Sequence, residues 1–401
     1  MGAPDNPFWY GREVGALVGR DADVAATVHT LTNAERLFLL APRRFGKTSV
    51  LEVAASEVAA HGMAVLRYDA ESYDTIPLLA RAMATEATQL FAASPDRGGE
   101  IARRFFHTLR PAASFDLSDQ RLTVDFDLTP EQRRHPAVVL ADVLEGIEQL
   151  ADTHGRPTAV ILDEFQEILI EGGDRAADHL RRAVESHRFV GYAFASSRAR
   201  TITGVTGPPS GPFWKLGPTR VLGPVPRADF RPFVRRGLES ASAMVDDDAI
   251  EHIFELAEDV PYNVQWLSSA CRDAVRLGHA HTSAHAPAIT TATVDAVLEQ
   301  LVNDGHAMYA QTWINLTNAQ RRTLRAIADE RANESGDERG EDFRLTEVAG
   351  AHGLPPSTMQ RTLVALEERS LIRYIASPTG TRWSLGDPFF AHWLARAQMP
   401  A

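Results

Sequence analysis

The chain has 401 residues, of which 44% are hydrophobic, and its formal net charge of −12 disfavours general attraction to the phosphates of nucleic acids. Its single cysteine, Cys271, excludes a disulfide framework and a cysteine metal site, so we expect a small buried apolar residue there. No stretch is apolar for long enough to span a membrane, and residues 1–6 lack the features of a signal peptide, so we expect a cytoplasmic protein.

The first half of the chain alternates short apolar or β-branched runs with longer helical patterns, which is typical of a parallel sheet covered by helices. An alternating polar and apolar stretch at 112–128, around Ser118 and Asp119, predicts an inserted hairpin. The expected strands are 37–40, 64–68, 159–162 and 190–195, with a fifth at 219–222.

After Pro226 the pattern predicts helices only, which indicates a helical lid; the expected helices are 228–240, 247–257, 262–276 and 291–302. The last part predicts a helix at 316–330, a polar loop at 331–342, helices at 346–352 and 357–369, and a hairpin over 371–385. That order is typical of a winged helix. The sequence therefore predicts an α/β core over 1–225, a helical lid over 226–305 and a winged-helix domain over 306–401.

Residues 41–49 lie between an expected strand and an expected helix, and they follow the P-loop pattern G-x-x-x-x-G-K-[ST] except that Ala41 replaces the first glycine. Backbone N–H groups at such a helix start favour phosphate, Lys47 can reach the β- and γ-phosphates, and the Thr48 hydroxyl can hold Mg²⁺. We expect the binding residues to be Pro42, Arg43, Arg44, Phe45, Gly46, Lys47, Thr48 and Ser49.

Two carboxylates, Asp163 and Glu164, end the apolar run at 159–162. A buried parallel strand delivers its last residues to the same sheet edge as the P-loop. We expect Asp163 to bind Mg²⁺ through water and Glu164 to polarise the attacking water in phosphoryl transfer. The alternative is a solvated acidic helix start.

The next strand ends in Ser196 and Ser197, and we favour Ser197 as the polar residue that senses the γ-phosphate, with a loop-capping serine as the alternative. Several arginines are expected near this edge, where they could neutralise phosphate charge within this chain or in a neighbouring subunit; the alternative is a set of solvated surface residues. These arginines are Arg43, Arg44, Arg198 and Arg200.

Together these motifs resemble the prokaryotic AAA+-like ATPases of the STAND and archaeal-ATPase group over most of the chain. Asn6-Pro7-Phe8 and Leu17-Val18-Gly19-Arg20-Asp21 are similar to the family's N-terminal segment, which implies that Gly19 and Arg20 lie near adenine. Val260-Pro261-Tyr262 resembles the lid motif, which implies that Pro261 packs against the base. Asp387-Pro388-Phe389-Phe390 resembles the family's closing segment. Ser196 stands where a glycine is usual, and Arg272 is the lid residue considered for a second sensor.

Two other clusters leave alternatives open. His279, His281 and His285 could ligate Zn²⁺ or could belong to a flexible connector, and their Ala, Thr and Ser neighbours favour the connector. The 357–369 helix offers Thr358, Gln360 and Arg361 to a DNA groove, but its later acids, Glu367 and Glu368, favour docking to protein over DNA readout.

The predicted function is a Mg²⁺- and ATP-dependent switch that couples its nucleotide state to a protein partner or, as the less favoured choice, to DNA, with a homo-oligomer left open and no membrane partner. The replacement of the first P-loop glycine by Ala41 puts hydrolysis of ATP in more question than binding of ATP. The alternatives are a DNA-binding regulator in which the nucleotide is only structural, and a scaffold with an inactive P-loop.

Overall fold

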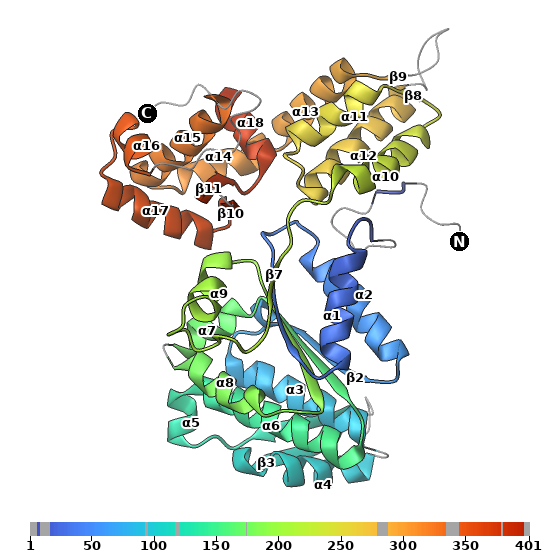
Figure 1. Cartoon of the computed structure of the whole chain (residues 1–401), viewed down its shortest axis with the longest axis vertical. Helices are drawn as coiled ribbons and strands as arrows, with labels where there is room; N and C mark the ends of the chain where they lie inside the picture. The colour runs from blue at the N-terminus through green and yellow to red at the C-terminus, as the bar shows by residue number, and fades with distance from the viewer. Residues whose placement is uncertain are drawn as a thin grey trace. The chain divides into compact units, whose positions relative to one another are not determined.

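The computed structural model describes residues 6–8, 17–92, 95–116, 121–173, 175–278, 288–333, 345–377 and 380–396. The chain groups into two compact units, which Figure 1 colours along the sequence. The core unit contains Arg20–Ala41 and Lys47–Leu222. The C-terminal unit contains Met1–Gly19, the loop segment Pro42–Gly46, and Gly223–Ala401.

The core unit is built on a five-stranded parallel sheet, as the sequence predicts. The strands lie in the order β2-β5-β6-β1-β7, and every residue of β5 and β6 is buried because helices cover both faces. Their bounds are β1 (Arg36–Leu40), β2 (Ala64–Asp69), β5 (Thr158–Asp163), β6 (Val190–Ser196) and β7 (Thr219–Val221).

Helices cover the two faces of this sheet unequally (Figure 1). One face carries α1 (Asp21–Thr32) and α2 (Lys47–Ala60). The other carries the larger apolar layer of α3 (Ile76–Phe91), α6 (Pro136–His154) and α8 (Ala176–Glu185). The shorter helices of the unit are η1 (Ala70–Ser72), α4 (Pro95–Phe105), η2 (His107–Leu109), α5 (Pro130–Arg134), α7 (Gln166–Gly172) and α9 (Ala199–Thr206).

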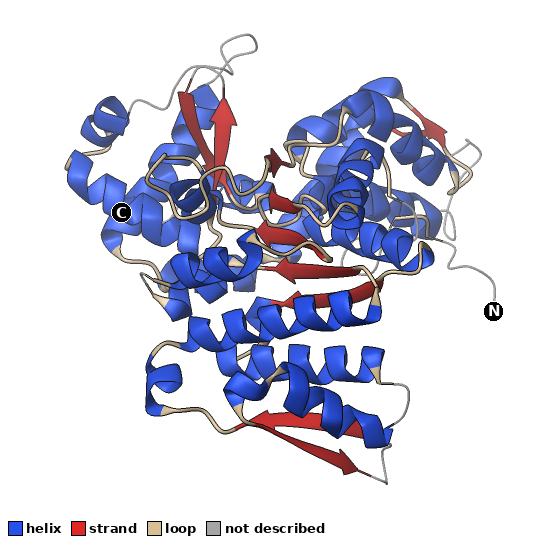
Figure 2. Ribbon diagram, turned by 60° about the horizontal axis from the view of Figure 1, so that its bottom comes forward, coloured by secondary structure: helices blue, strands red, loops and turns tan. Residues whose placement is uncertain are grey.

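The predicted inserted hairpin is present as β3 (Pro111–Asp116) and β4 (Arg121–Phe126), which pair antiparallel. Ser118 and Asp119 lie outside the described residues. The hairpin lies against α3, because the Val124 N–H donates to the Thr85 hydroxyl at 3.0 Å and the Gln89 side chain donates to the Leu122 carbonyl at 2.8 Å. Figure 2 shows it at the side of the unit away from the five-stranded sheet. It therefore extends the unit without entering the central sheet.

The first part of the C-terminal unit contains the four predicted helices, α10 (Arg227–Glu239), α11 (Asp247–Leu256), α12 (Pro261–Gly278) and α13 (Thr291–Asp304). The sequence predicts helices only, but the two-residue strands β8 (Met244–Val245) and β9 (Ala288–Ile289) also pair there. Such short strands leave no periodic signal. Cys271 is buried in α12, and burial raises the pKa of its thiol to about 12, as expected for an apolar residue.

The last part contains α15 (Asn318–Asn333), α16 (Leu345–Ala351), α17 (Pro356–Glu368), the antiparallel pair β10 (Ile372–Ser377) and β11 (Gly380–Leu385), and α18 (Pro388–Arg396). An unpredicted helix, α14 (His306–Ile314), precedes them. One apolar cluster runs through the whole C-terminal unit from Phe8 to Trp393. The three-domain division and the winged-helix interpretation stay predictions. Among the described helices, none combines the length and the apolar character needed to cross a bilayer.

Candidate functional site

Strand order brings the predicted motifs of the core unit to one sheet edge. Strand β6 lies between β1, which precedes the P-loop, and β5, which ends in Asp163. The backbone N–H of Ala41 donates to the Ser196 carbonyl at 3.1 Å, and that of Phe165 donates to the Ala195 carbonyl at 2.8 Å. Because all three strands are parallel, their carboxyl ends meet where ligands bind in open α/β sheets.

Lys47 and Asp163, which the sequence predicts to converge, are in direct contact. The Lys47 ammonium, only 5% exposed, donates to one oxygen of Asp163 and, at 2.7 Å, to Oε1 of Glu164. The Thr48 hydroxyl donates to the other Asp163 oxygen at 3.0 Å. A buried cation thus holds both carboxylates, and the predicted metal-binding hydroxyl lies beside the predicted metal-binding carboxylate.

Glu164 is positioned by more than Lys47. Its Oε2 accepts hydrogen bonds from the Ser197 hydroxyl and from the Gln166 side-chain amide, each at 2.6 Å. Its backbone has φ of +48°, in the left-handed region that non-glycine residues occupy at a cost. Burial by itself raises the pKa of Glu164, but the charge of Lys47 and the hydrogen bonds from Lys47, Ser197 and Gln166 outweigh burial and lower that pKa to about 2.

The two serines at the end of β6 have different partners. The Ser196 hydroxyl accepts from the Arg198 N–H at 3.0 Å, so it closes the turn after the strand. The Ser197 hydroxyl instead faces Glu164. The arrangement favours Ser197 over Ser196 as the functional serine, as the sequence does. Arg198, one of the candidate arginines, forms an ion pair with Glu167 at 3.0 Å.

The sequence reasoning missed two residues at this edge. Gln166 is fully buried next to Glu164 at the start of α7, and the only sequence signal is its position two residues after Glu164. Asp69 ends β2 and pairs in register with Asp163. Burial and the charges of Asp163 and Glu164 raise the pKa of Asp69, while the Glu71 N–H opposes this. Asp69 could have been found, because it ends an apolar strand just as Asp163 does.

The loop segment Pro42–Gly46 belongs to the C-terminal unit by its contacts. Arg44 has φ of +74°, its carbonyl accepts from the Tyr262 N–H at 3.4 Å, and its guanidinium lies 5.0 Å from the Tyr262 ring centre. The guanidinium also pairs with Asp387 at 2.9 Å. The Phe45 ring lies 5.6 Å from the Arg373 guanidinium. Two of the predicted phosphate-binding residues therefore also have partners in the C-terminal unit.

The residues fit a magnesium–nucleotide complex in their chemistry. Gly46 has φ of +85°, and no atom lies within 4 Å of the point where a Cβ would stand, so its backbone is open beside the start of α2. Lys47 and Thr48 follow it directly in the chain. Hydroxyl and carboxylate oxygens, as on Thr48 and Asp163, are the ligands that Mg²⁺ prefers. Ser49 lies half-buried in the first turn of α2, and Pro42 and Arg43 begin the loop segment.

The residues implied by the family resemblance lie as follows. Gly19 has φ of +64°, and a Cβ there would fall 2.6 Å from Val225. Arg20, 5% exposed, lies 3.5 Å from Asp23, and burial lowers its pKa. Pro261 is buried at the start of α12. The role of Gly19, Arg20 and Pro261 as nucleotide-binding residues stays a prediction.

Arg272, the lid residue considered for a second sensor, is buried inside the C-terminal unit. It donates to the Ser240 hydroxyl at 2.8 Å and pairs with Asp273 at 2.8 Å. The candidate zinc residues His279, His281 and His285 lie outside the described residues. Within the part of the chain that is described, no three His, Cys, Asp or Glu side chains gather as a metal site.

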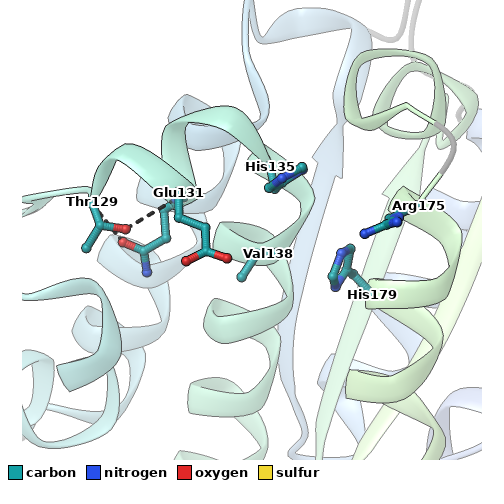
Figure 3. Close-up of a pocket in the computed structure, with 7 residues that line it drawn as sticks. Thr129, Glu131, His135, Val138, Arg175 and His179 are labelled. Atoms are coloured by element: carbon teal, nitrogen blue, oxygen red, sulfur yellow. Dashed lines mark hydrogen bonds between the residues drawn. The ribbon is translucent and has the colours of Figure 1, made fainter.

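A separate cavity of about 300 Å³ opens in the core unit between α5, the start of α6 and the start of α8 (Figure 3). His135, Arg175 and His179 line it together with the carboxylate of Glu131. In Figure 3, Glu131 and His179 come from different helices. The Thr129 hydroxyl caps the start of α5 by accepting a hydrogen bond from the Gln132 N–H at 3.2 Å. None of its lining residues belongs to the hydrogen-bonded cluster of Lys47, Thr48, Asp163 and Glu164, which we call the Lys47 cluster. The cavity is therefore distinct from the predicted site.

No protein-family model and no curated protein sequence matches the chain. Among solved structures it is similar to the Walker-type ATPase of Pyrococcus abyssi, with 15% identity, 94% of this chain and 96% of that chain covered, and a TM-score of 0.57. Weaker matches are the Aeropyrum pernix Orc1 protein in complex with DNA (12% identity, 95% and 93% covered, TM-score 0.47) and the Thermotoga maritima RuvB Holliday junction branch migration motor (14%, 95% and 96%, TM-score 0.41).

The likeness to the Pyrococcus ATPase confirms the fold that the motifs predict. The chain therefore shares with that protein an α/β fold that has a parallel sheet core and a helical C-terminal region.

Proposed function

We propose that the chain binds and hydrolyses ATP with Mg²⁺ and works as a nucleotide-dependent switch for a protein partner. The observation that carries this proposal is the hydrogen-bonded cluster in which Lys47 and Thr48, at the start of α2, meet Asp163 and Glu164, at the end of β5. A buried cation, a metal-type hydroxyl and two carboxylates are the groups that phosphoryl transfer requires.

Binding would change the partners of Lys47. Its ammonium would leave the carboxylates for the β- and γ-phosphates, where a P-loop lysine acts as a point charge. Thr48 and Asp163 would hold Mg²⁺, which when bound neutralises charge that develops on the phosphate oxygens.

Glu164 would then change its protonation behaviour. Lys47 is the largest influence that lowers the pKa of this carboxyl, and burial raises that pKa. Losing the ammonium therefore makes the carboxylate a better proton acceptor. Ser197 and Gln166 continue to hold Oε2, so Oε1, the atom that Lys47 leaves, becomes available to orient and polarise the attacking water.

The proposal that the protein works as a switch rests on the loop segment Pro42–Gly46, which belongs to the C-terminal unit although the next residue, Lys47, belongs to the core unit. Arg44 and Phe45 contact residues of the C-terminal unit, and Lys47 follows only two residues later in the core unit. A change of phosphate contacts at Lys47 would alter the backbone that carries Arg44. ATP and ADP would then favour different arrangements of the C-terminal unit, which would present different surfaces to a partner.

Turnover of the purified chain with Mg²⁺ and ATP tests this function. We expect Glu164→Gln to lower kcat by about 10²- to 10⁴-fold, which is the usual contribution of a positioned general base, while ATP stays bound. Glu57→Gln is the control, since Glu57 is an exposed carboxylate on α2, away from Glu164 in the chain. A wild-type chain that neither turns over nor retains nucleotide would contradict the proposal, whereas retention without turnover would favour a structural nucleotide.

A further inference from the structure

The C-terminal unit contains a cavity of about 420 Å³ whose lining has an excess of positive charge. Arg43, Arg44 and Arg369 line it, and Asp387 is the one carboxylate among its lining residues. The cavity is therefore lined by three guanidiniums and one carboxylate. Arginine suits recognition of phosphate and carboxylate because its planar fork can donate two parallel hydrogen bonds.

Asp387 acts as an internal anion in this cavity. Its carboxylate pairs with Arg44 at 2.9 Å, and it accepts hydrogen bonds from the Asn263 side chain at 3.1 Å and from the Phe389 N–H at 3.0 Å at the start of α18. The Arg44 side chain is 38% exposed, whereas that of Asp387 is 16% exposed. Arg44 can therefore exchange this carboxylate for an anion from solvent more easily than Asp387 can move.

Tyr309 supplies a second, independent observation. This residue lines the cavity and is only 3% exposed, yet its hydroxyl has no hydrogen-bond partner among the described residues. A buried hydroxyl without a partner is costly, and native structures usually satisfy it. Burial raises the pKa of this hydroxyl most, the charges of Asp387 and Tyr262 raise it further, and the charge of Arg44 opposes that rise. An acceptor that replaced Asp387 at Arg44 would lie near the unsatisfied hydroxyl.

The remaining wall of the cavity is apolar. Met308, more than half exposed, lies on α14, and the Phe390 ring stacks on the Tyr309 ring with centres 5.4 Å apart. Small-molecule sites combine such apolar walls with a few polar groups, and 420 Å³ lies within their usual size range.

We propose that this cavity is a binding site for a small organic anion, whose phosphate or carboxylate group replaces Asp387 as the partner of Arg44, accepts from the Tyr309 hydroxyl and contacts Arg369. The apolar body of the ligand packs against Met308 and Phe390. Lys47, Thr48, Asp163 and Glu164 do not line this cavity, but Arg43 and Arg44 do, so it shares the loop segment Pro42–Gly46 with the proposed nucleotide site. Tyr309 and Arg369 belong to this cavity alone, so variants of these two residues test it separately from the proposed nucleotide site.

Calorimetric titration of the full chain with phenyl phosphate tests this site, with benzoate and inorganic phosphate as parallel probes. We expect phenyl phosphate or benzoate to bind more tightly than inorganic phosphate, because only the aryl compounds can use the apolar wall. Tyr309→Phe should weaken binding by up to about tenfold, the value of one hydrogen bond, without lowering Tm, because it also removes an unsatisfied buried hydroxyl.

Three further variants sharpen the test. Arg369→Gln should weaken binding, and Arg361→Gln, an exposed arginine of α17 that does not line the cavity, should leave it unchanged. Asp387→Asn should strengthen binding several-fold, because it removes the competing charge while asparagine still caps a helix. The proposal is overturned if neither aryl compound binds, if inorganic phosphate binds as tightly as they do, or if Tyr309→Phe and Arg369→Gln leave binding unchanged. None of these outcomes depends on whether the chain hydrolyses ATP.

Discussion

Two basic residues of the P-loop motif, Lys47 at the start of α2 and Arg44 in the loop segment before it, form ion pairs of different kinds. Lys47 is 5% exposed and is shared between Asp163 and Glu164, whereas the Arg44 side chain is 38% exposed and pairs with Asp387 alone. A buried pair leaves uncompensated charge when one partner is lost, but an exposed pair loses little because water replaces the partner. Neighbouring residues of one sequence motif can therefore have different energetic roles. Lys47 lies at the centre of the proposed catalytic site, whereas Arg44 can exchange its partner.

Replacing Lys47 should give the largest effect on stability. We expect Lys47→Met to lower the free energy of unfolding by about 3 to 5 kcal/mol at neutral pH, because two buried carboxylates lose their cation. Urea unfolding measures this, and Lys215→Met, at the chain's other lysine, is the exposed control. A loss equal to that of the control would mean that Lys47 is not energetically coupled to the carboxylates.

The same variant has a pH dependence of predictable sign. In the wild type the folded-state pKa of Glu164 is lowered to about 2 from an ordinary value of 4.5, so the stability it contributes is complete above about pH 4.5 and is lost as pH falls toward 2. Without Lys47, only the hydrogen bonds from Ser197 and Gln166 oppose the effect of burial, so the pKa of Glu164 is lowered less. The difference in unfolding free energy between wild type and Lys47→Met should therefore be smaller at acidic than at neutral pH, and a difference that grew on acidification would contradict this explanation.

Substitution of Ser197 should mainly affect kcat, whereas substitution of Ser196 should mainly affect thermal stability. Ser197→Ala removes one hydrogen bond to Glu164, so we expect kcat for ATP to fall by roughly tenfold, the value of about 1.4 kcal/mol. Ser196→Ala removes the bond that closes the turn after β6, so it should lower Tm more than it lowers kcat. Equal losses of kcat in the two variants would remove the distinction between a positioning serine and a turn-closing serine.

Arg44→Gln should change stability little, which is the other half of the comparison. We expect a loss of at most about 1 kcal/mol in unfolding free energy, because the ion pair is partly exposed. High salt should reduce even this difference. A loss as large as that of Lys47→Met would show that the two pairs are not of different kinds.

Arg361→Ala should have the smallest effect. Gln360 and Arg361 lie exposed on α17, but the protein is acidic overall, so we expect no salt-dependent shift of duplex DNA by the wild type and none by the variant. A sequence-selective shift that Arg361→Ala abolished would favour the DNA-binding regulator over the protein-coupled switch.

The sequence predicted the parts of this molecule that local patterns determine. Apolar or β-branched runs marked four strands of the sheet, and 219–222 was predicted as a possible fifth without such a run. Lys47 and Asp163 were predicted to share an edge because parallel strands bring their carboxyl ends to the same side of the sheet. Gln166 escaped prediction, since a buried amide becomes meaningful only when its neighbour Glu164 is placed. Helix α14 was missed because its pattern is weakly amphipathic.

The pair of Arg44 with Asp387 could not be predicted either. Each residue belongs to a recognisable local pattern, a P-loop and a helix start, and each pattern explains its charge without reference to the other. The two patterns do not lie at the ends of strands of one sheet, as those of Lys47 and Asp163 do, so their contact depends on packing that the sequence patterns do not indicate. For the same reason the orphan hydroxyl of Tyr309 becomes visible only in the folded chain.

The central position of β6 sets the width of the proposed catalytic centre. Only this strand separates β1 from β5, so the ends of those two strands lie two strand spacings apart, roughly 10 Å at about 4.8 Å each. Gly191 in β6 admits no larger residue without displacing the end of α1, because a Cβ there would fall 2.3 Å from the Leu31 carbonyl oxygen. A rigid middle strand thus acts as a fixed spacer between the backbones of β1 and β5, and the long side chain of Lys47 crosses that spacing to reach Asp163 and Glu164.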